Sequence, residues 1–508
     1  MHLLPLRLNG LGPHRQTQSS TRNWALATAL IVLCVANGCS NSQSDKSSGP
    51  VFSNASLHGN YMYTLSGSSF SANGTSQYKE SGSFVADGNG NITGGVDDFV
   101  QNSNLSTSQP TGTYKIDSDG TGTVTLALNR GTVQFALSLI SPSSFYMMEF
   151  DSSASGDGEG TQQTTDAFSA TPNGTLIFRL SSSSGNNALG AVVSVGQMMI
   201  ESGSITGTED FVRAGVPGSS AITGSITAPD ANGRGTAVLN DDSGTQSDYI
   251  YYVIDSENLK FLQTDAGSLG EGRADAQSGT FSNASLSSGF VFWSRGSTLS
   301  QSFGANSAGA FVGDGNGNIV SGSYDAVLDG TPVSNTSLTG TYQVDPNGRA
   351  TITLTPAGAS PIQLIVWMVD SSYALLLVNT SNLAAVGRLD QQQGSPFSAD
   401  SLNGSYAFYM FGSEMQSSPW LTRVGVMSFD GNGTVTFSDY FVNTSGVTQQ
   451  KGPLTGNYSV SANGRVTAFT VGVVNTQVIY LVSNASGSLL LGASGSALAG
   501  NFNQQAPP

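Results

Sequence analysis

One side chain that could do chemistry returns four times in this chain, a carboxylate in the segment after a hairpin turn. The four residues are Asp98, Asp210, Asp325 and Asp439. A carboxylate kept at one place in each copy of a repeat could bind a ligand at the end of a β module. It could equally bond to a neighbouring strand, or pair with the arginines that follow a second turn in copies two to four, Arg234, Arg349 and Arg465. The sequence leaves both roles open, ligand binding and structural pairing.

The hairpin turn itself is a second candidate, as a cation site. Three copies carry Asp-Gly-Asn-Gly, at residues 87–90, 314–317 and 430–433, which resembles the middle of an EF-hand calcium loop. Calcium takes about six to eight oxygen ligands, and in copy four Asp430, Asn432 and Asp439 could contribute. No flanking helix is expected, so a hairpin turn, which Asn-Gly and Asp-Gly pairs favour, is the preferred interpretation.

The chain lacks the residues on which many catalytic sites depend. It has three histidines and two cysteines, and His2, His14 and Cys34 fall in a segment expected to be removed. Ser–His and Cys–His catalysis and histidine zinc sites need partners that His58 and Cys39 alone do not supply. We therefore predict a protein that is not an enzyme and uses no cofactor.

Paired carboxylates are the catalytic arrangement that remains. Asp97 and Asp98 are adjacent, as are Glu209 and Asp210, and a glycosidase uses two acids. Neighbours on a strand point to opposite faces of the sheet, which argues against either pair acting together. A carboxylate-dependent glycoside hydrolase is the lesser alternative.

The elements that must position these residues come in four copies. Glycines recur at intervals of 115 residues, each opening an apolar run, at Gly59, Gly174, Gly289 and Gly404. A period this long indicates a duplicated domain, because solenoid repeats usually run about 20–50 residues. Short alternating runs between Asn-Gly and Asp-Gly turns predict about seven or eight antiparallel strands in each copy. The predicted fold class is all-β, in four tandem modules.

The first 39 residues have the layout of an export signal. Residues 1–22 are polar and basic, and Trp24–Ala36 is apolar but too short to span a membrane comfortably. Residues 35–39 read Val-Ala-Asn-Gly-Cys and resemble the lipobox of bacterial lipoproteins. The resemblance implies that the signal is removed before Cys39, which then carries lipid. We expect an exported protein that is lipid-anchored in the bacterial cell envelope, at the outer membrane or cell surface.

The charge balance excludes one class of partner. The chain has 18 basic and 34 acidic residues, a net charge of −16. Removal of Arg7, Arg15 and Arg22 with the signal leaves 15 basic residues and a net charge of −19. A chain this acidic repels phosphate backbones, so nucleic acid is not expected as a partner.

Each module is expected to close into a barrel. Closure of about eight strands removes the edges that four adjacent copies would otherwise mispair. In size and turn spacing the modules resemble calycin-type small barrels, the lipocalins and avidins, in architecture only. A β-sandwich is the alternative. The predicted parts are a signal peptide at 1–38, a flexible tether at 39–54, and β modules at 55–169, 170–284, 285–399 and 400–508.

The predicted function is binding without catalysis. We expect a cell-surface or periplasmic lipoprotein whose repeated modules are adhesive or structural, with a glycan, a protein or a small apolar ligand as partner. Aromatic residues on the first strands could stack on sugar rings or fill the core. The calycin resemblance implies the alternative of a carrier that encloses a small apolar ligand in each barrel. An interior filled by side chains would exclude that carrier.

Overall fold

The computed structural model describes residues 51–72, 74–184, 187–298, 304–328, 330–414, 418–470, 477–491 and 496–506. The predicted signal, Cys39 and most of the tether lie outside these residues. The modules belong to one compact unit, Ser48–Pro508. The described helices are short 3₁₀ turns before the first strand of each module: η1 (Asn54–Ser56), η2 (Thr165–Ser169), η3 (Asn283–Leu286) and η4 (Ala399–Ser401). None of these described helices has the length and apolar character needed to cross a membrane.

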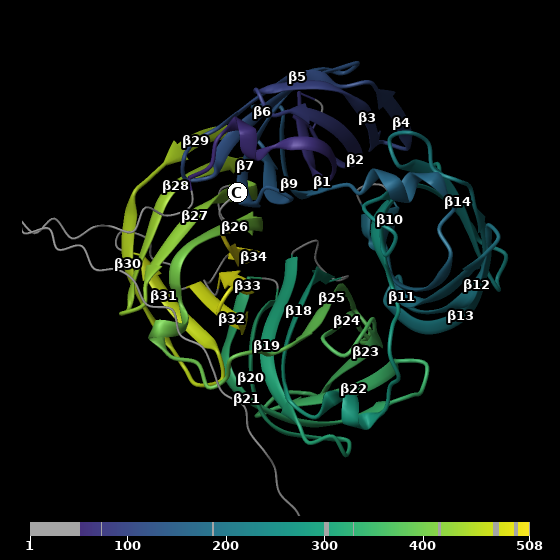
Figure 1. Cartoon of the computed structure of the whole chain (residues 1–508). Helices are drawn as coiled ribbons and strands as arrows, with labels where there is room; N and C mark the ends of the chain where they lie inside the picture. The colour runs from purple at the N-terminus through teal and green to yellow at the C-terminus, as the bar shows by residue number, and fades with distance from the viewer. Residues whose placement is uncertain are drawn as a thin grey trace, which may run out of the picture. The chain divides into compact units, whose positions relative to one another are not determined.

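Each module forms a closed antiparallel β-barrel (Figure 1). The predicted all-β class and the barrel are therefore confirmed, and the β-sandwich alternative is wrong. Neighbouring strands are mostly consecutive in the chain, and the last strand of each barrel pairs with the first. Closure satisfies the backbone hydrogen bonds that an open edge would expose.

The strands of the first two barrels are as follows. Barrel one contains β1 (His58–Ser71), β2 (Gly74–Asp87), β3 (Asn91–Gln101), β4 (Asn104–Ser108), β5 (Thr111–Ile116), β6 (Thr121–Leu128), β7 (Gly131–Ser141), β8 (Ser144–Glu149) and β9 (Ala154–Gln162). Barrel two contains β10 (Gly174–Ser184), β11 (Asn187–Glu201), β12 (Ser204–Arg213), β13 (Val216–Ile226), β14 (Arg234–Asp241), β15 (Gln246–Val253), β16 (Asn258–Gln263) and β17 (Ser268–Ala276).

The other two barrels repeat this order. Barrel three contains β18 (Gly289–Thr298), β19 (Gly304–Gly313), β20 (Asn318–Leu328), β21 (Thr331–Val344), β22 (Arg349–Pro356), β23 (Ile362–Met368), β24 (Tyr373–Val378) and β25 (Leu383–Gln391). Barrel four contains β26 (Asn403–Glu414), β27 (Ser418–Asp430), β28 (Thr434–Thr444), β29 (Val447–Lys451), β30 (Leu454–Val460), β31 (Arg465–Thr470), β32 (Gln477–Ser483), β33 (Ser486–Leu491) and β34 (Ser496–Gln504).

One strand is broken in barrels one and four but continuous in barrels two and three. Strands β13 and β21 are unbroken, whereas β4 and β5, like β29 and β30, are separated by a short gap. A proline stands in each gap, Pro110 and Pro453. Proline has no N–H to donate to the neighbouring strand, so regular pairing stops there.

Apolar side chains fill the described interior of each barrel. In barrel one the rings of Tyr61 and Phe84 stack with their centres 5.6 Å apart, and both are buried. In barrel three Phe290, Phe292 and Phe311 pack together in the same manner. Barrels two and four contain equivalent clusters. Because side chains occupy the space that a ligand would need, the carrier alternative has no support.

The linkers dock each barrel onto the next through a repeated glutamine contact. Gln163 Nε2 donates hydrogen bonds to the carbonyl oxygens of Asn232 (3.3 Å) and Val253 (2.6 Å) in barrel two. Gln277 and Gln392 make the equivalent two bonds to barrels three and four. Each linker is therefore a specific attachment and not a loose spacer.

The segment after the last strand makes the same contact on barrel one. Gln505 Nε2 donates to the carbonyl oxygens of Asp119 (2.8 Å) and Leu139 (2.9 Å). Gly120, in the turn next to Gln505, has φ +86°. A Cβ at this position would lie 2.6 Å from Gln505 Nε2, too close for both groups to keep their places. Contacts therefore run from each barrel to the next and from the fourth back to the first, in a closed cycle.

Candidate functional site

The recurring aspartate Asp98 lies at the contact between barrels one and two. Its carboxylate accepts hydrogen bonds from Arg234 of barrel two, at 2.6 Å from Nε and 3.1 Å from Nη2. The hydroxyls of Tyr252 and Thr107 donate to it as well, each at 2.6 Å. The Asp98 side chain is fully buried, so its negative charge is neutralised within the protein.

The same arrangement returns at the next two contacts. Asp210 accepts from Arg349 of barrel three at 2.9 and 2.7 Å, and from Trp367 Nε1 at 2.9 Å. Asp325 accepts from Arg465 of barrel four at 2.7 and 2.8 Å, and from a tyrosine hydroxyl at 2.6 Å. Each aspartate thus pairs with the arginine of the following barrel, and its carboxylate is already engaged.

The contact between barrels four and one uses different groups. Asp439 lies in β28, and barrel one has Thr121 where the other barrels have the arginine. Asn443 Nδ2 instead donates to the carbonyl oxygens of Glu149 (3.0 Å) and Ala154 (2.7 Å). Next to copy one, which lacks the arginine, the interface thus includes bonds to backbone carbonyls, and the hydroxyls of Ser155 and Thr422 also meet there at 2.9 Å.

The calcium candidates Asp430 and Asn432 form a turn between β27 and β28. Asp430 Oδ1 accepts hydrogen bonds from the backbone N–H groups of Asn432 and Thr434, both at 2.8 Å. The bonds from Thr434 and Asn432 lower the pKa of this exposed carboxyl. Across the described residues, no group of three His, Cys, Asp or Glu side chains is arranged to hold a metal ion.

The adjacent acid pairs point in opposite directions. Asp97 faces barrel one, where Arg130 Nη1 lies 2.6 Å from its Oδ2, while Asp98 faces barrel two. Glu209 pairs with Arg213 of its own strand, while Asp210 reaches barrel three. Neither pair can therefore act on one substrate, as strand alternation predicts.

Buried carboxylates also gather inside barrel one, around Arg130. Its guanidinium binds Glu80 (2.7 Å) and Asp97 (2.6 Å), and Tyr63 donates to Asp97 at 2.8 Å. Both acids are at most 1% exposed, so no substrate reaches them. Burial, and then the nearby Asp97, raise the pKa of Glu80 well above its usual value. The cluster is a structural network and not a catalytic dyad.

Glu149 makes the stability of this region depend on pH. Burial, and then the nearby Asp151, raise the pKa of Glu149 to about 8. The folded protein therefore holds a proton at neutral pH that the unfolded chain has released, so stability falls as pH rises through this range. Between pH 6 and pH 8 we expect a loss of about 2 kcal/mol in the free energy of unfolding.

Urea unfolding of wild type and Glu149→Gln at the two pH values measures this effect. The neutral glutamine should flatten the pH dependence, whereas Glu257→Gln, at an exposed turn position, should leave it unchanged. An equally steep dependence in Glu149→Gln would mean that another group carries it.

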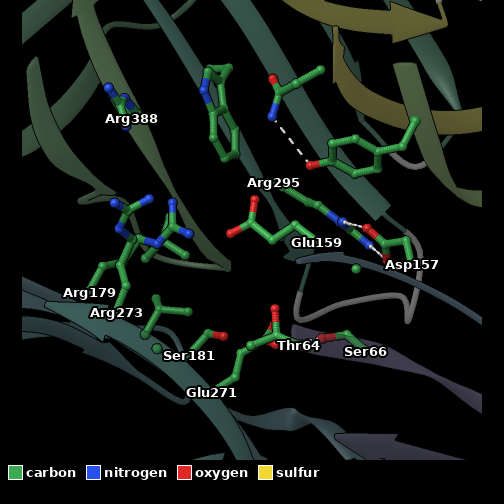
Figure 2. A pocket seen from close by; sticks show the side chains of 18 of the residues that line it. Thr64, Ser66, Asp157, Glu159, Arg179, Ser181, Glu271, Arg273, Arg295 and Arg388 are labelled. Carbon is green, nitrogen blue, oxygen red and sulfur yellow. Dashed lines mark hydrogen bonds and ion pairs between the residues drawn. The ribbon is translucent and has the colours of Figure 1, made fainter. Parts of the chain in front are cut away.

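A cavity of about 610 Å³ lies where the four barrels approach one another. Its lining comes mainly from the first and last strands of the barrels (Figure 2). Four structurally equivalent residues of the first strands line it: Thr64, Arg179, Trp293 and Tyr409. In the strand register, each of them lies opposite a residue of the last strand of its barrel. These four opposite residues also line the cavity: Glu159, Arg273, Arg388 and Asn501. The cavity is thus built from outward-facing residues at equivalent places in the repeat.

Strand alternation explains why these side chains face outward. In β10, Leu176, Phe178 and Leu180 belong to the core of barrel two. Arg179 and Ser181 lie between and after them, so they point away from that core into the cavity. Neither residue type nor spacing distinguishes these two residues in the sequence; their place on the outward side of an alternating strand is the signal that points to them.

The cavity is rich in charge of both signs. Six basic side chains line it, Lys79, Arg179, Lys260, Arg273, Arg295 and Arg388, with four acids, Asp157, Glu159, Glu271 and Asp390. Most are paired within the protein. Arg295 Nη1 lies 2.9 Å from Asp157, Lys79 Nζ lies 2.7 Å from Glu271, and Arg388 Nε lies 2.5 Å from Asp390. A site with an excess of cations therefore exists in a chain whose net charge is −16.

Two acids of the cavity, Glu159 and Glu271, have lowered pKa values and remain ionised at neutral pH. The ammonium group of Lys260 lowers the pKa of Glu159 to about 2. Burial opposes ionisation of Glu271, but the charge and hydrogen bond of Lys79 hold its pKa below the usual value. The cavity can therefore offer fixed charges, donors and acceptors to a ligand; within it the Ser66 hydroxyl donates to the Glu271 carboxylate at 2.6 Å.

Comparison with known proteins yields no family. No family model and no curated protein matches the chain. One similar solved structure is a tryptophan-to-alanine mutant of the vaccine antigen transferrin binding protein B from Haemophilus parasuis Hp5, with 9% identity and a TM-score of 0.18, covering 72% of this chain and 84% of that one. Another is intact Ap-TbpB with its N and C lobes, with 9% identity and a TM-score of 0.19, covering 93% of this chain and 98% of that one.

Proposed function

We propose that this protein is a non-enzymatic binding protein of the cell envelope, and that its ligand occupies the cavity between the four barrels. The ligand is small and polar, of the size and hydroxyl content of a short glycan or a glycan fragment. The observation that carries the proposal is the cavity itself, which collects charged and hydroxyl side chains from all four barrels. Its volume of about 610 Å³ lies within the roughly 300–1,000 Å³ typical of ligand pockets.

The rest of the molecule supports binding rather than catalysis. The barrel interiors are packed with apolar side chains, and the buried acids of barrel one are closed to substrates. The cavity lining adds hydroxyl and amide side chains to the charged residues, among them Ser66, Ser181 and Asn501. Trp293 and Tyr409 supply aromatic faces there, which suit a sugar ring.

The proposal includes a lipid anchor at Cys39, which rests on the lipobox resemblance. A lipidated cysteine would hold the barrels at the envelope through the polar residues 40–50. Replacing Cys39 by Ala should move the protein from the membrane fraction to the soluble fraction of a bacterium that expresses it. Membrane retention of the variant would contradict the anchor without touching the binding site.

A cavity-filling variant tests the binding function. Ser181 faces the cavity (Figure 2), so Ser181→Trp should block it and abolish binding to an array of bacterial and host glycans and peptidoglycan fragments. Ser219→Trp is the matched control, because Ser219 is exposed on β13 of the same barrel. Binding that survives Ser181→Trp, or a wild type that binds nothing on the array, would contradict the proposal.

A further inference from the structure

Arg179 differs from the other basic residues of the cavity in forming no ion pair with a described carboxylate. The others each form an ion pair with a carboxylate. Among the residues that the structure describes, Arg179 forms none. Its Nη1 donates to the carbonyl oxygen of Gly387 at 3.1 Å, and its guanidinium lies 5.6 Å from the centre of the Trp293 ring. A guanidinium has about five N–H donors, so Arg179 keeps donors for a ligand.

A second guanidinium stands beside Arg179. Arg179 and Arg273 are directly opposite each other on β10 and β17, and like charges at such positions repel. Figure 2 shows the two side chains next to each other on one wall of the cavity. Burial and the charge of Arg273 lower the pKa of Arg179 to about 10, so it stays protonated at neutral pH. Arg273 already donates to Asp275 from Nε (2.9 Å) and Nη2 (2.7 Å), so an anion between the two arginines would take donors of Arg179 and the Nη1 group of Arg273.

We infer that Arg179 and Arg273 form an oxyanion subsite, which takes the carboxylate or phosphoryl group of a small hydroxylated ligand. The inference rests on the function proposed above and names the chemical class of the ligand. Guanidinium groups bind both oxyanions through paired N–H donors. Ser181, two residues from Arg179 on the same face of β10, offers a hydroxyl, and the Trp293 ring lies beside the guanidinium.

The basic residues of the cavity stand out because the chain as a whole is acidic, with a net charge of −16. A protein with 34 acidic and 18 basic residues repels anions over most of its surface. Six of those basic residues nevertheless line one cavity, and they come from three of the four barrels. No ion pair with a described carboxylate holds Arg179 there, although the charges of Glu271, Glu159 and Asp275 act on it from farther away. Recognition of an anion gives that charge a role.

Glu159 opposes an anionic ligand and provides a test of opposite sign. It lies across from Arg179 and Arg273 in Figure 2, its side chain is 45% exposed, and Lys260 pairs with it. Because it is ionised at neutral pH, it competes with a ligand anion for the two arginines. Removing its charge should therefore strengthen anion binding, whereas removing the charge of Arg179 should weaken it. A purely structural role for Arg179 would not give opposite effects.

Calorimetric titration of the full-length protein tests the subsite with three probes: glucuronate, glucose 6-phosphate and glucose. We expect at least one acidic sugar to bind more tightly than glucose. Arg179→Gln should weaken that binding about tenfold or more, as loss of a charge-assisted hydrogen bond does, and should leave glucose unaffected. Glu159→Gln should strengthen it several-fold. Lys115→Gln, which removes one positive charge at an exposed site, should change nothing.

The probes separate the outcomes. Binding of glucuronate alone assigns the subsite to carboxylates, and binding of glucose 6-phosphate alone assigns it to phosphoryl groups. Glucose binding as tight as that of both acidic sugars, in wild type and Arg179→Gln alike, would overturn the oxyanion subsite but leave the binding function intact. Failure of both acidic sugars to bind the wild type would also overturn it, while the array with Ser181→Trp decides the function separately. Circular dichroism checks that each variant keeps its β-sheet spectrum.

Discussion

Replacing Asp98 by Asn is expected to lower the free energy of unfolding by about 3 kcal/mol. The carboxylate is fully buried and neutralises Arg234 of the next barrel through two hydrogen bonds. Asn removes the charge and turns an N–H₂ group towards a guanidinium that has no other described acidic partner. Breaking a buried ion pair by removing one partner costs roughly 3–5 kcal/mol, and the partial exposure of Arg234, at 23%, favours the lower end.

Urea unfolding of the purified protein measures this loss, with Asp117→Asn as the matched control. Asp117 pairs with Lys115 at 2.6 Å, but the two side chains are 45% and 73% exposed. Exposed pairs contribute little, so the control should change the unfolding free energy by less than about 0.5 kcal/mol. Equal effects of the two substitutions would show that the Asp98 pair does not hold barrels one and two together.

Replacing Gln505 by Ala is expected to loosen the contact that closes the cycle of barrels. The side chain is only 7% exposed, and its loss leaves the carbonyl oxygens of Asp119 and Leu139 without the bonds that it donates. Each unsatisfied buried acceptor costs roughly 1–3 kcal/mol, so the expected loss is about 3 kcal/mol. Because no peptide bond links barrel four to barrel one, this loss should appear as local opening of their contact.

Hydrogen exchange of the backbone amides in β7 and β27 measures the opening. Those strands meet at the contact, where Ser138 Oγ donates to the carbonyl oxygen of Gly425 at 2.9 Å. Gln392→Ala is the control, since Gln392 makes the equivalent two bonds but the chain continues from it into barrel four. A covalent link keeps the local concentration of the two barrels high. Faster exchange at the corresponding strands in both variants, to the same extent, would contradict a special role for the closing contact.

The features that the sequence predicted well depend on local chemistry. Asp-Gly and Asn-Gly pairs favour turns wherever they occur, and the carboxylate of Asp314 accepts the turn N–H groups of Asn316 and Asn318 as the hairpin interpretation requires. Alternation alone separates core from exterior, as with Phe290 and Phe292 inside barrel three. The glycines that recur every 115 residues predicted four modules in tandem. The number of strands expected in each module favoured a closed barrel over a sandwich.

Local sequence patterns do not predict which charged residues pair with each other across barrels. The sequence allows pairing of the recurring aspartates with Arg234, Arg349 and Arg465, but it does not assign each aspartate to the arginine of the following barrel. Such a pair joins residues about 140 positions apart, as Asp325 and Arg465 are, and no local signal specifies contacts at that separation. The lack of an arginine in copy one became intelligible only with the different contact between barrels four and one.

By itself, the sequence determined the all-β class, the fourfold repetition, the turns and the inward or outward side of many residues, because each depends on neighbours a few positions away. The tertiary structure alone decided what the outward residues face. Leu180 and Arg179 are adjacent in β10, and alternation assigns them to opposite sides. Whether the outer side meets solvent, another barrel or a cavity depends on how the three other barrels pack around it. That packing is held by the hydrogen bonds of Gln505 and by the buried aspartate–arginine pairs. The cavity that the four barrels line together exists only once those long-range contacts have formed.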